Sequence, residues 1–477
     1  MEYDYATAAP GPDSLVSPVP LDDQAEPIND IQALPAHVSK VPTPSFYPQR
    51  GTWFDEAIDF RDPEGDAVTR EVLALIAANE KRERRRRPID KENHYIIVRK
   101  ILANGFRCHF HRHPHLVAYS RKADGYTGGP SWLSGPALAR TVDLLVVAGL
   151  LDTRLGKWGE ASSIYHIKPR LYIIAQACGI TTHSLTLRLP SGALVRLREA
   201  NSETPHLAFE PTDETRYWTD ELEAYNAFIR QQDIDLALTP DEEAAWLWHW
   251  NEKRKGRDQN LPVLCRPERF KTDLYRSFNN GSFEEGGRLY GAWWINTPKH
   301  LRGRIAINGQ PTVELDYSGC AIRMLYHERG IDYRDDPYWL ESLAAHEAEA
   351  GLKTNHYREG VKALMQALIN GNSDGRPEMA RIEGFTFKPA FERPQVRRMI
   401  EEKHALIADA FGTGAGLRLQ RKDSDLALAI ITELRRHGIV VLPIHDSFIT
   451  TDRNRDYLFD LMNTKYNGMF GFNPIIK

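Results

Sequence analysis

The strongest constraint on the fold is a pair of short apolar runs that each end in an aspartate. In VELD, Val313 and Leu315 alternate with polar neighbours as in a strand, and Asp316 stands at its end. The run VVLPIHDSFIT reads as two strands folded back at His445 and Asp446. A single Asp at a strand end is usually a cap or a surface residue. Two that meet can instead hold a divalent cation against a rigid sheet.

Between the two aspartates, the segment HYREGVKALMQALINGN has polar residues at every fourth position. Arg358, Lys362 and Gln366, with Asn370 one step further, share one face of a predicted helix. The other face carries an apolar stripe: Val361, Leu364, Met365 and Leu368. Such a polar face can bind a triphosphate through paired donors of Arg358 and through Lys362, a mobile charge or a proton donor to the leaving pyrophosphate. The alternative is an ordinary solvated helix face.

Together these segments resemble, in order, motifs A, B and C of the family A DNA polymerases and the single-subunit phage-type RNA polymerases. The matching residues are Asp316-Tyr317-Ser318 for motif A, Arg358, Lys362 and Asn370-Gly371 for motif B, and His445-Asp446-Ser447 for motif C. Two further matches are Gln420 and Asp425, in the helix before motif C, and Gly287-Arg288-Leu289, in the segment that contacts primer-template. The resemblance covers about residues 285–455.

The resemblance implies an α+β fold with a right-hand, polymerase-like palm and helical thumb and fingers. Asp316 and Asp446 would ligate two Mg²⁺ ions, or Mn²⁺ in their place, and the backbone carbonyl of Tyr317 could be a further metal ligand. The ions would activate a 3′-hydroxyl and stabilise the leaving oxygen, with NTPs or dNTPs as substrates and DNA as template.

Other roles carry over residue by residue. Arg358 and Lys362 would bind the incoming triphosphate, in a nucleotide site that also includes Tyr317, Ala321, Gln366 and Asn370. On the nucleic-acid side, Arg288 and Gln420 would touch the duplex near the growing end, and His445 would support the primer terminus.

Two positions depart from the family A DNA polymerases. There, a Glu five residues after the motif A Asp, with an aromatic residue of motif B, closes the space that a ribose 2′-hydroxyl would occupy. This chain has Ala321 and Asn370 instead. We therefore expect ribonucleotide use, as in a primase or an RNA polymerase-like enzyme. The alternatives are a primer-extending DNA polymerase of a phage, plasmid or mobile element, and a DNA-binding replication initiator or regulator with an inactive palm.

The rest of the chain predicts further units. A helix, a second helix capped by Ser134 and a β-hairpin follow one another in residues 90–178, which is the order of a winged-helix DNA-binding domain. The expected organisation is a disordered Pro- and acid-rich tail at 1–65, a helix with a basic end at 66–89 that Pro88 stops, the winged-helix-like domain at 90–178, a linker or small strands at 179–214, a helical thumb-like region at 215–285, and palm and fingers at 286–477. Within 215–285 the expected helices include 221–232, 241–255 and 267–279.

Composition limits the remaining possibilities. On a strand, CHFHRHPH could present alternate histidines to a metal. Pro114 interrupts that run of histidines, so a basic, partly exposed strand without a metal explains the composition better. The four cysteines include no close pair, and no apolar run is long enough to span a bilayer. With a net charge of −4, any nucleic-acid affinity must come from local patches such as KRERRRR at 81–87. We expect a cytoplasmic protein, in a host cell if phage- or plasmid-encoded, with replication proteins as possible partners and no membrane contact.

Overall fold

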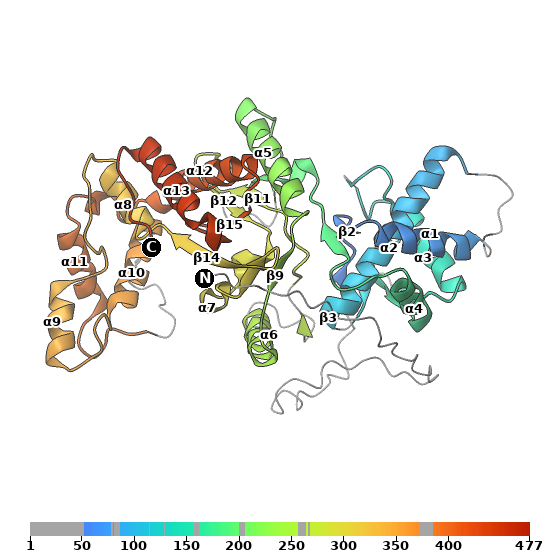
Figure 1. Cartoon of the computed structure of the whole chain (residues 1–477), viewed down its shortest axis with the longest axis horizontal. Coiled ribbons are helices and arrows are strands. Elements are labelled where there is room, and N and C mark those ends of the chain that lie inside the picture. The colour runs from blue at the N-terminus through green and yellow to red at the C-terminus, as the bar shows by residue number, and fades with distance from the viewer. Residues whose placement is uncertain are drawn as a thin grey trace, which may run out of the picture.

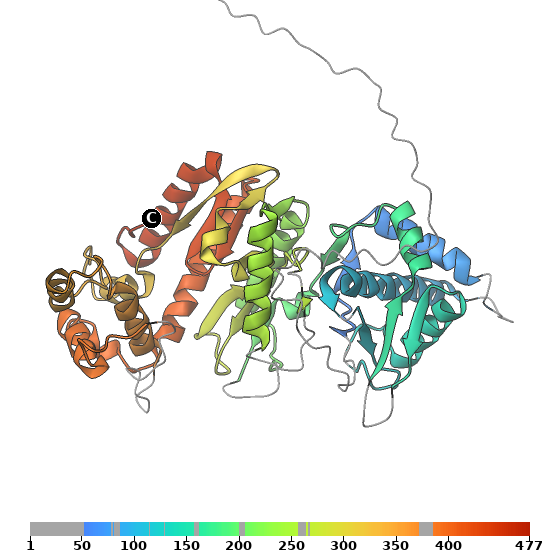
Figure 2. The same cartoon turned by 90° about the horizontal axis from the view of Figure 1, so that it is seen from below.

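The computed structural model describes residues 52–77, 80, 86–113, 115–127, 129–156, 162–199, 206–255, 264–265, 268–371 and 385–477. It is a mixed α+β protein, elongated, with the N-terminal part at one end (Figures 1 and 2). Two hydrophobic cores hold it together. One is built from residues 54–187 with Phe270, and the other from residues 194–466. The α+β class expected from the sequence is confirmed.

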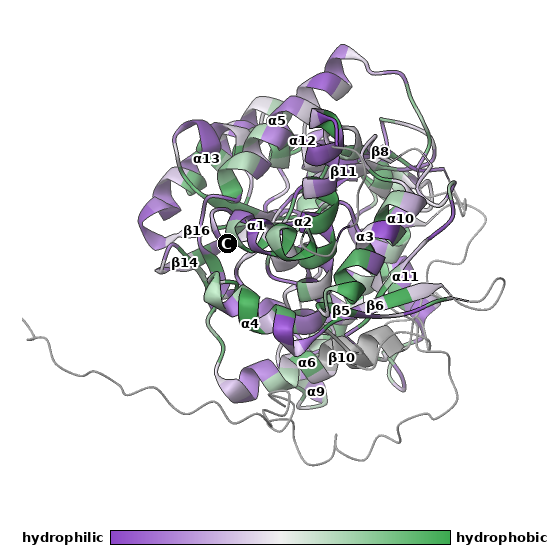
Figure 3. Ribbon diagram, turned by 90° about the vertical axis from the view of Figure 1, so that its right-hand side faces the viewer, coloured by the Kyte–Doolittle hydropathy of each residue, from purple (hydrophilic) through white to green (hydrophobic). Residues whose placement is uncertain are grey.

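The N-terminal core lies between four helices and a four-stranded sheet. Its elements are β1 (Thr52–Trp53), β2 (Ile58–Phe60), α1 (Glu64–Ala77), α2 (Pro88–His111), β3 (Arg112–His113), β4 (Val117–Tyr119), α3 (Gly135–Val147), β5 (Leu151–Arg154), β6 (Ser163–Ile167), α4 (Pro169–Ala177) and β7 (Leu185–Leu187). The sheet order is β1-β4-β6-β5, with β5 and β6 antiparallel. Ser134 caps α3 by accepting from the backbone N–H of Ala137, and α3 carries both hydrophobic and hydrophilic residues (Figure 3). The predicted order of helix, helix and hairpin is present.

Two boundaries differ from the sequence-based expectations. Residues 52–65, expected in the tail, form β1, β2 and the start of α1, whereas residues 1–51 lie outside the described part of the chain. The helix expected over 66–89 ends at Ala77, and Pro88 begins α2 instead of stopping α1. Proline suits that first helical position because its missing N–H has no partner there. Of the run at 81–87, only Arg86 and Arg87 are described, and they pair with Glu80 and Asp90.

The strand expected at CHFHRHPH is confined to β3 (Arg112–His113), which pairs with β10. Residues 108–111 form the last turn of α2, because Phe106 and Cys108 belong to the core that this helix face covers. His109 is packed 4.9 Å from Tyr172 between ring centroids, and burial together with the charge of His115 lowers its pKa to about 4. Across the described ranges of the chain, no group of three or more His, Cys, Asp or Glu residues is arranged to hold a metal ion.

The C-terminal core surrounds two sheets. Its elements are β8 (Val195–Leu197), α5 (Asp213–Ile229), β9 (Ile234–Leu236), α6 (Pro240–Lys255), β10 (Leu264–Cys265), β11 (Tyr275–Phe278), β12 (Gly286–Tyr290), α7 (Lys299–Arg302), β13 (Ile305–Ile307), β14 (Gln310–Asp316), α8 (Cys320–His327), α9 (Glu341–Glu349), α10 (Arg358–Asn370), α11 (Arg393–Lys403), α12 (Ala415–Arg436), β15 (Val441–Ile444), β16 (Ser447–Thr451) and α13 (Arg455–Phe470). One sheet is antiparallel in the order β15-β16-β14-β13-β9, and the other has the order β12-β11-β8. Helices α9, α10 and α11 gather at the end opposite the N-terminal part (Figure 1).

The region 215–285 is only partly helical. Helix α6 covers the segment expected at 241–255 and α5 covers the one expected at 221–232 as far as Ile229, but the helix expected over 267–279 is wrong. That segment contains β11, in which Arg276, Ser277 and Phe278 are all buried while Tyr275 is partly exposed. The charged residue and the serine at buried positions hid the strand in the sequence. Strand β9 of the same region joins the five-stranded sheet.

A buried ion pair joins the two parts of the molecule. Arg107 of α2 donates from Nε to a carboxylate oxygen of Glu268 at 2.6 Å, with side-chain exposures of 7% and 5%. Phe270 then packs in the N-terminal core. Among the described helices, none has the length and apolar character needed to cross a membrane.

Candidate active site

The ends of β14 and β16 bring the two aspartates together. The strands pair antiparallel in a register that sets Asp316 opposite Ser447, so Asp446 lies in the turn directly beside the end of β14. The backbone N–H of Tyr317 donates to the carbonyl of Asp446 at 3.1 Å and ties the two turns to each other. Here the predicted hairpin, strand ends and juxtaposition are all observed. Both carboxylates line a cavity of about 440 Å³.

The same cavity is lined by every predicted site residue except His445. The residues are Arg288, Asp316, Tyr317, Ala321, Arg358, Lys362, Gln366, Asn370, Gln420 and Asp446. They come from β12, β14, α8, α10, α12 and the β15–β16 turn, which are far apart in the sequence. Helix α10 has the predicted apolar stripe, because Val361, Leu364, Met365 and Leu368 are buried.

The negative charge of the two carboxylates is only partly compensated by nearby cations. Burial and the charge of Asp446 raise the pKa of Asp316 to about 6, although Lys299 and Lys362 partly counter this. Neither Asp316 nor Asp446 has an ion-pair partner among the residues that the structure describes. Two adjacent carboxylates on rigid strand ends, with nearby backbone oxygens, are the hard oxygen donors that Mg²⁺ prefers. The donor set therefore fits a divalent cation.

A third carboxylate, which the sequence analysis did not predict, lies at the same cavity. Asp423 of α12 is 5% exposed, and its pKa is raised by burial and by the charges of Asp446 and Asp316. It accepts from Nε of Arg288 at 3.2 Å. The signal was present, since Asp423 follows Gln420 by three residues and so shares its helix face. Asp425, five residues after Gln420, does not line the cavity.

Three lysines line the same cavity as the carboxylates. Lys299, Lys362 and Lys477 all line it, and none has an ion-pair partner within the described ranges. Lys477 is placed by a two-way backbone pairing, because Asp316 and Lys477 each donate N–H to the other's carbonyl at 3.0 Å. Lys299 and Lys477 were not predicted, because nothing local in the sequence connects them with the motifs. The three cations make the cavity suitable for a polyanionic ligand.

Arg358 is already engaged. Its Nε donates to a carboxylate oxygen of Asp336 at 2.9 Å, and its guanidinium lies 5.1 Å from the ring centroid of Tyr338. The hydrogen bond to Asp336 raises the pKa of Arg358. The contacts with Asp336 and Tyr338 orient the guanidinium at the first turn of α10, where it lines the cavity beside Lys362.

Three predicted nucleotide contacts stand near the start of α8 and the end of α10. Ala321 presents only a methyl group to the cavity. Asn370 donates from Nδ2 to the backbone carbonyl of Gln366 at 2.7 Å, and its side chain lies against α12 at Gly416, where a Cβ would collide with it. The phenol of Tyr317 is turned into the core and donates to the carbonyl of Met462 at 2.8 Å, so only its backbone is available to the cavity.

His445 is the predicted site residue that does not line the cavity. It holds a left-handed backbone (φ 58°) in the turn before Asp446, and its ring lies 6.0 Å from that of Tyr290 between centroids. Burial, with the charges of Arg288 and Arg302, lowers its pKa to about 4, so the ring is neutral at pH 7. Its Nδ1 is buried without a hydrogen-bond partner among the described residues.

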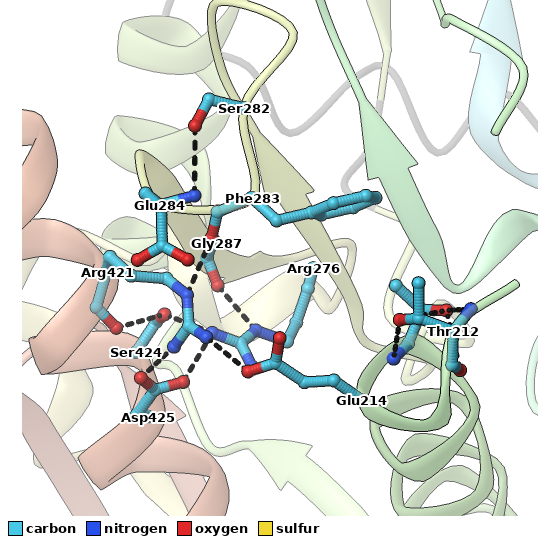
Figure 4. A network of polar contacts seen from close by, with 11 residues as sticks. Thr212, Glu214, Arg276, Ser282, Phe283, Glu284, Gly287, Arg421, Ser424 and Asp425 are labelled. Carbon is cyan, nitrogen blue, oxygen red and sulfur yellow. Dashed lines mark hydrogen bonds and ion pairs between the residues drawn. The ribbon is translucent and has the colours of Figure 1, made fainter. Parts of the chain in front are cut away.

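Behind the cavity, a polar network fixes α12 against β11 and β12 (Figure 4). Arg276, fully buried, donates to the carbonyl of Gly287 at 2.9 Å and to Asp425 at 3.0 Å. Arg421 also pairs with Asp425, and it donates to Glu214 of α5 at 2.7 Å. The network sets the rotation of α12, which turns Gln420 and Asp423 toward the cavity.

Neither a protein-family model nor a curated protein sequence matches this chain.

Proposed function

We propose that this protein is a template-directed nucleotidyltransferase, a nucleic-acid polymerase that uses metal-assisted phosphoryl transfer and accepts ribonucleotides. The observation that carries the proposal is the register of β14 and β16, which brings Asp316 next to Asp446. Both residues line a cavity that is also lined by lysines. The order and spacing of the three motifs support it independently. In this proposal the five-stranded sheet is the palm, and α9, α10 and α11 are the fingers.

Asp316 and Asp446, with the backbone oxygen of Tyr317, would hold Mg²⁺. Bound there, the metal would lower the pKa of a 3′-hydroxyl and neutralise charge on the transferring phosphoryl group. The need for such a cation is supported by the raised pKa of Asp316, which reflects burial beside a second carboxylate without a compensating ion pair. Mn²⁺ has similar ligand preferences and is expected to substitute.

The residues of the chain supply binding and orientation. Lys362, exposed on α10 and without an ion-pair partner in the described ranges, would bind the triphosphate and protonate the leaving pyrophosphate. Arg358 would contribute paired donors from the geometry that Asp336 fixes. Lys299 and Lys477 add positive charge on the side of Asp316.

Ribonucleotide use is supported by what surrounds the cavity next to α8 and α10. Ala321 fills little space there, and the side chain of Asn370 is drawn toward Gln366 and Gly416. A ribose 2′-hydroxyl needs room and a hydrogen-bond partner. The methyl group leaves the room, and the amide of Asn370 or Gln366 provides the partner.

The N-terminal part would present the template. Its helix, helix and hairpin order is that of winged-helix domains, and the buried Arg107–Glu268 pair links it to the catalytic part. Small α+β domains with other roles share this order, so the polymerase proposal does not depend on it.

The experiment supplies the full chain with single-stranded DNA, with and without a primer, NTPs or dNTPs, and Mg²⁺, and sizes the products. We expect incorporation that falls at least about a thousand-fold in Asp316→Ala and in Asp446→Ala while DNA binding survives. Asp456→Ala is the matched control, because Asp456 is 91% exposed on α13. Synthesis by both cavity variants at the wild-type rate would refute the metal-ligand assignment, and exclusive dNTP use would refute the inference from Ala321.

A further inference from the structure

We propose that one face of the β12-β11-β8 sheet binds an unpaired nucleic-acid strand. This proposal goes beyond the proposed polymerase function, because the binding site is argued from the sheet alone. Its residues, which we call the strand face, are Arg196, Arg198, Tyr275, Arg288 and Tyr290, with His445 at its end. Apart from Arg288 and His445, none belongs to the segments that resemble the polymerase motifs.

The strand register puts Arg196, Tyr275, Arg288 and Tyr290 on one side of the sheet, and Arg198 follows directly after β8. Tyr275 is directly opposite Tyr290, and Ser277 is opposite both Arg288 and Arg196. Because side chains alternate along a strand, the neighbours Val195, Leu197, Arg276, Phe278 and Leu289 point to the other side, where all are buried. The strand face is the polar, partly exposed side of an otherwise buried sheet, and Tyr290 is its most exposed ring at 36%.

Arginine and tyrosine alternate across this face. The guanidinium of Arg196 lies 3.4 Å from the ring centroid of Tyr275, and the rings of Tyr275 and Tyr290 are 6.0 Å apart at an angle of 33°. Tyr290 in turn contacts His445. The series of ring contacts therefore runs from β8 to the turn that carries Asp446. Aromatic rings interleaved with cations are what proteins use to bind single strands, because every base has a face that stacks.

The charge of the face is uncompensated at its β8 end. Arg196 uses Nε for the carbonyl of Ala193 at 2.8 Å, and neither Arg196 nor Arg198 has an ion-pair partner among the described residues. Their charges also lower the pKa of His206, after the larger effect of its burial. A phosphate backbone is the ligand that complements two such guanidinium groups next to aromatic rings.

An unpaired strand fits better than a duplex. In a duplex, bases are stacked on one another and show proteins only their edges and backbone, so a ring such as Tyr290 finds no free base face. Unpaired bases can stack on it, as they do on the aromatic residues of other sheet platforms. The contact of Tyr290 with His445 joins the strand face to the turn that carries Asp446, so the bound strand would lie next to the candidate active site.

The test measures binding, not synthesis, with the full chain and no added metal. Fluorescence anisotropy compares an oligothymidylate of roughly 12 nucleotides, within the site sizes of single-strand platforms, with a blunt duplex of equal length. We expect Tyr290→Leu to weaken single-strand binding about tenfold, since loss of one stacking ring has effects of this order. Tyr457→Leu, an equally exposed tyrosine on α13, is the control and should bind as wild type does.

A second arm tests the arginines. Removing two phosphate contacts in the double variant Arg196→Gln/Arg198→Gln should reduce the slope of log K against log salt by about 1.4 for a single strand. Arg216→Gln/Arg455→Gln, which alters two exposed arginines elsewhere, should leave the slope unchanged. A photoreactive oligothymidylate should also crosslink to the peptide that contains Tyr290 in the wild-type chain, so the test does not depend on a variant folding.

The outcomes separate the two proposals. Wild-type affinity in Tyr290→Leu, or tighter binding of the duplex with the same loss in the variant, would overturn the strand face whatever the chain synthesises. Single-strand binding that is lost in Tyr290→Leu, by a chain that incorporates no nucleotide, would keep the strand face and overturn the polymerase. Equal thermal unfolding of variant and wild type confirms that the affinities compare folded proteins.

Discussion

Asp316 and Asp446 are held next to each other by backbone pairing on both sides of β14. On one side β16 pairs up to Ser447, and on the other the N–H and carbonyl of Asp316 bond those of Lys477. The backbone therefore keeps the two carboxylates together even though their charges repel. Two carboxylates held this close lower the stability of the folded protein, but they also concentrate the negative charge that a cation site requires.

Asp316→Asn should consequently stabilise the metal-free protein. The pKa of Asp316 is raised to about 6, so the folded state holds more protons at this residue than the unfolded state between about pH 4 and pH 6. Wild-type stability thus falls as pH rises through that window. We expect the variant to gain about 1 to 2 kcal/mol at pH 8, after allowance for partial exposure, and nothing below about pH 4.

Urea unfolding in EDTA at pH 8 and pH 4 measures this gain, with Asp456→Asn as the exposed control. Added Mg²⁺ should reverse the ranking at pH 8, because it binds the folded wild type and not the variant. A variant that is less stable than wild type at pH 8 in EDTA would show that Asp316 is a structural residue.

The pair of Asp423 and Arg288 predicts a second result. Asp423→Asn keeps the shape of the side chain but removes the charge that holds Arg288 at the cavity. We expect the affinity for primer-template to fall about five- to tenfold, in line with the loss of one partly buried charge-assisted hydrogen bond. Arg288→Gln should cost a similar amount, and the double variant should cost no more than either single one. Additive losses would mean that the two residues act independently.

The local parts of this architecture could be predicted from the sequence. Strand β14, helix α10 and the β15–β16 hairpin were predicted, because each has its own apolar period and its own turn within a few residues. The meeting of Asp316 with Asp446 was inferred from the hairpin, whose tip carries Asp446. Short-range patterns were sufficient for these elements because neighbouring residues alone decide their period and their ends.

The missed features depend on tertiary contacts. Arg276 occupies a core position in β11, where Gly287 and the distant Ser424 and Asp425 make a buried guanidinium acceptable, so a strand looked like a helix. Lys299 and Lys477 reach the cavity from segments with no motif of their own. The histidines of α2 looked exposed because His109 is covered by Tyr172 from another helix.

Asp425→Asn should destabilise the fold without reaching the cavity. The change leaves Arg276, fully buried, and Arg421, 8% exposed, beside a neutral amide. Breaking one partner of a buried ion pair costs several kcal/mol, and partial exposure of Asp425 reduces this to about 2 to 3 kcal/mol. Glu214→Gln is the control in the same network, since Glu214 is 55% exposed and its loss should cost under about 1 kcal/mol. Urea unfolding of both variants provides the comparison, and equal costs would contradict the assignment.

Ala321→Glu tests the sugar specificity of the cavity. Ala321 lies on the first turn of α8, five residues after Asp316, and presents a methyl group to the cavity. A carboxylate there would occupy the space proposed for the ribose 2′-hydroxyl, so we expect the ratio of kcat/KM for an NTP to that for the matching dNTP to fall about 10- to 100-fold. Ala321→Ser, which adds a small hydroxyl, is the control and should change the ratio by less than about threefold. Primer extension with each nucleotide alone gives both values. If the ratio is the same in Ala321→Glu as in the wild type, the 2′-hydroxyl does not lie beside α8, and the choice of sugar has to be made at Asn370 and Gln366 on α10.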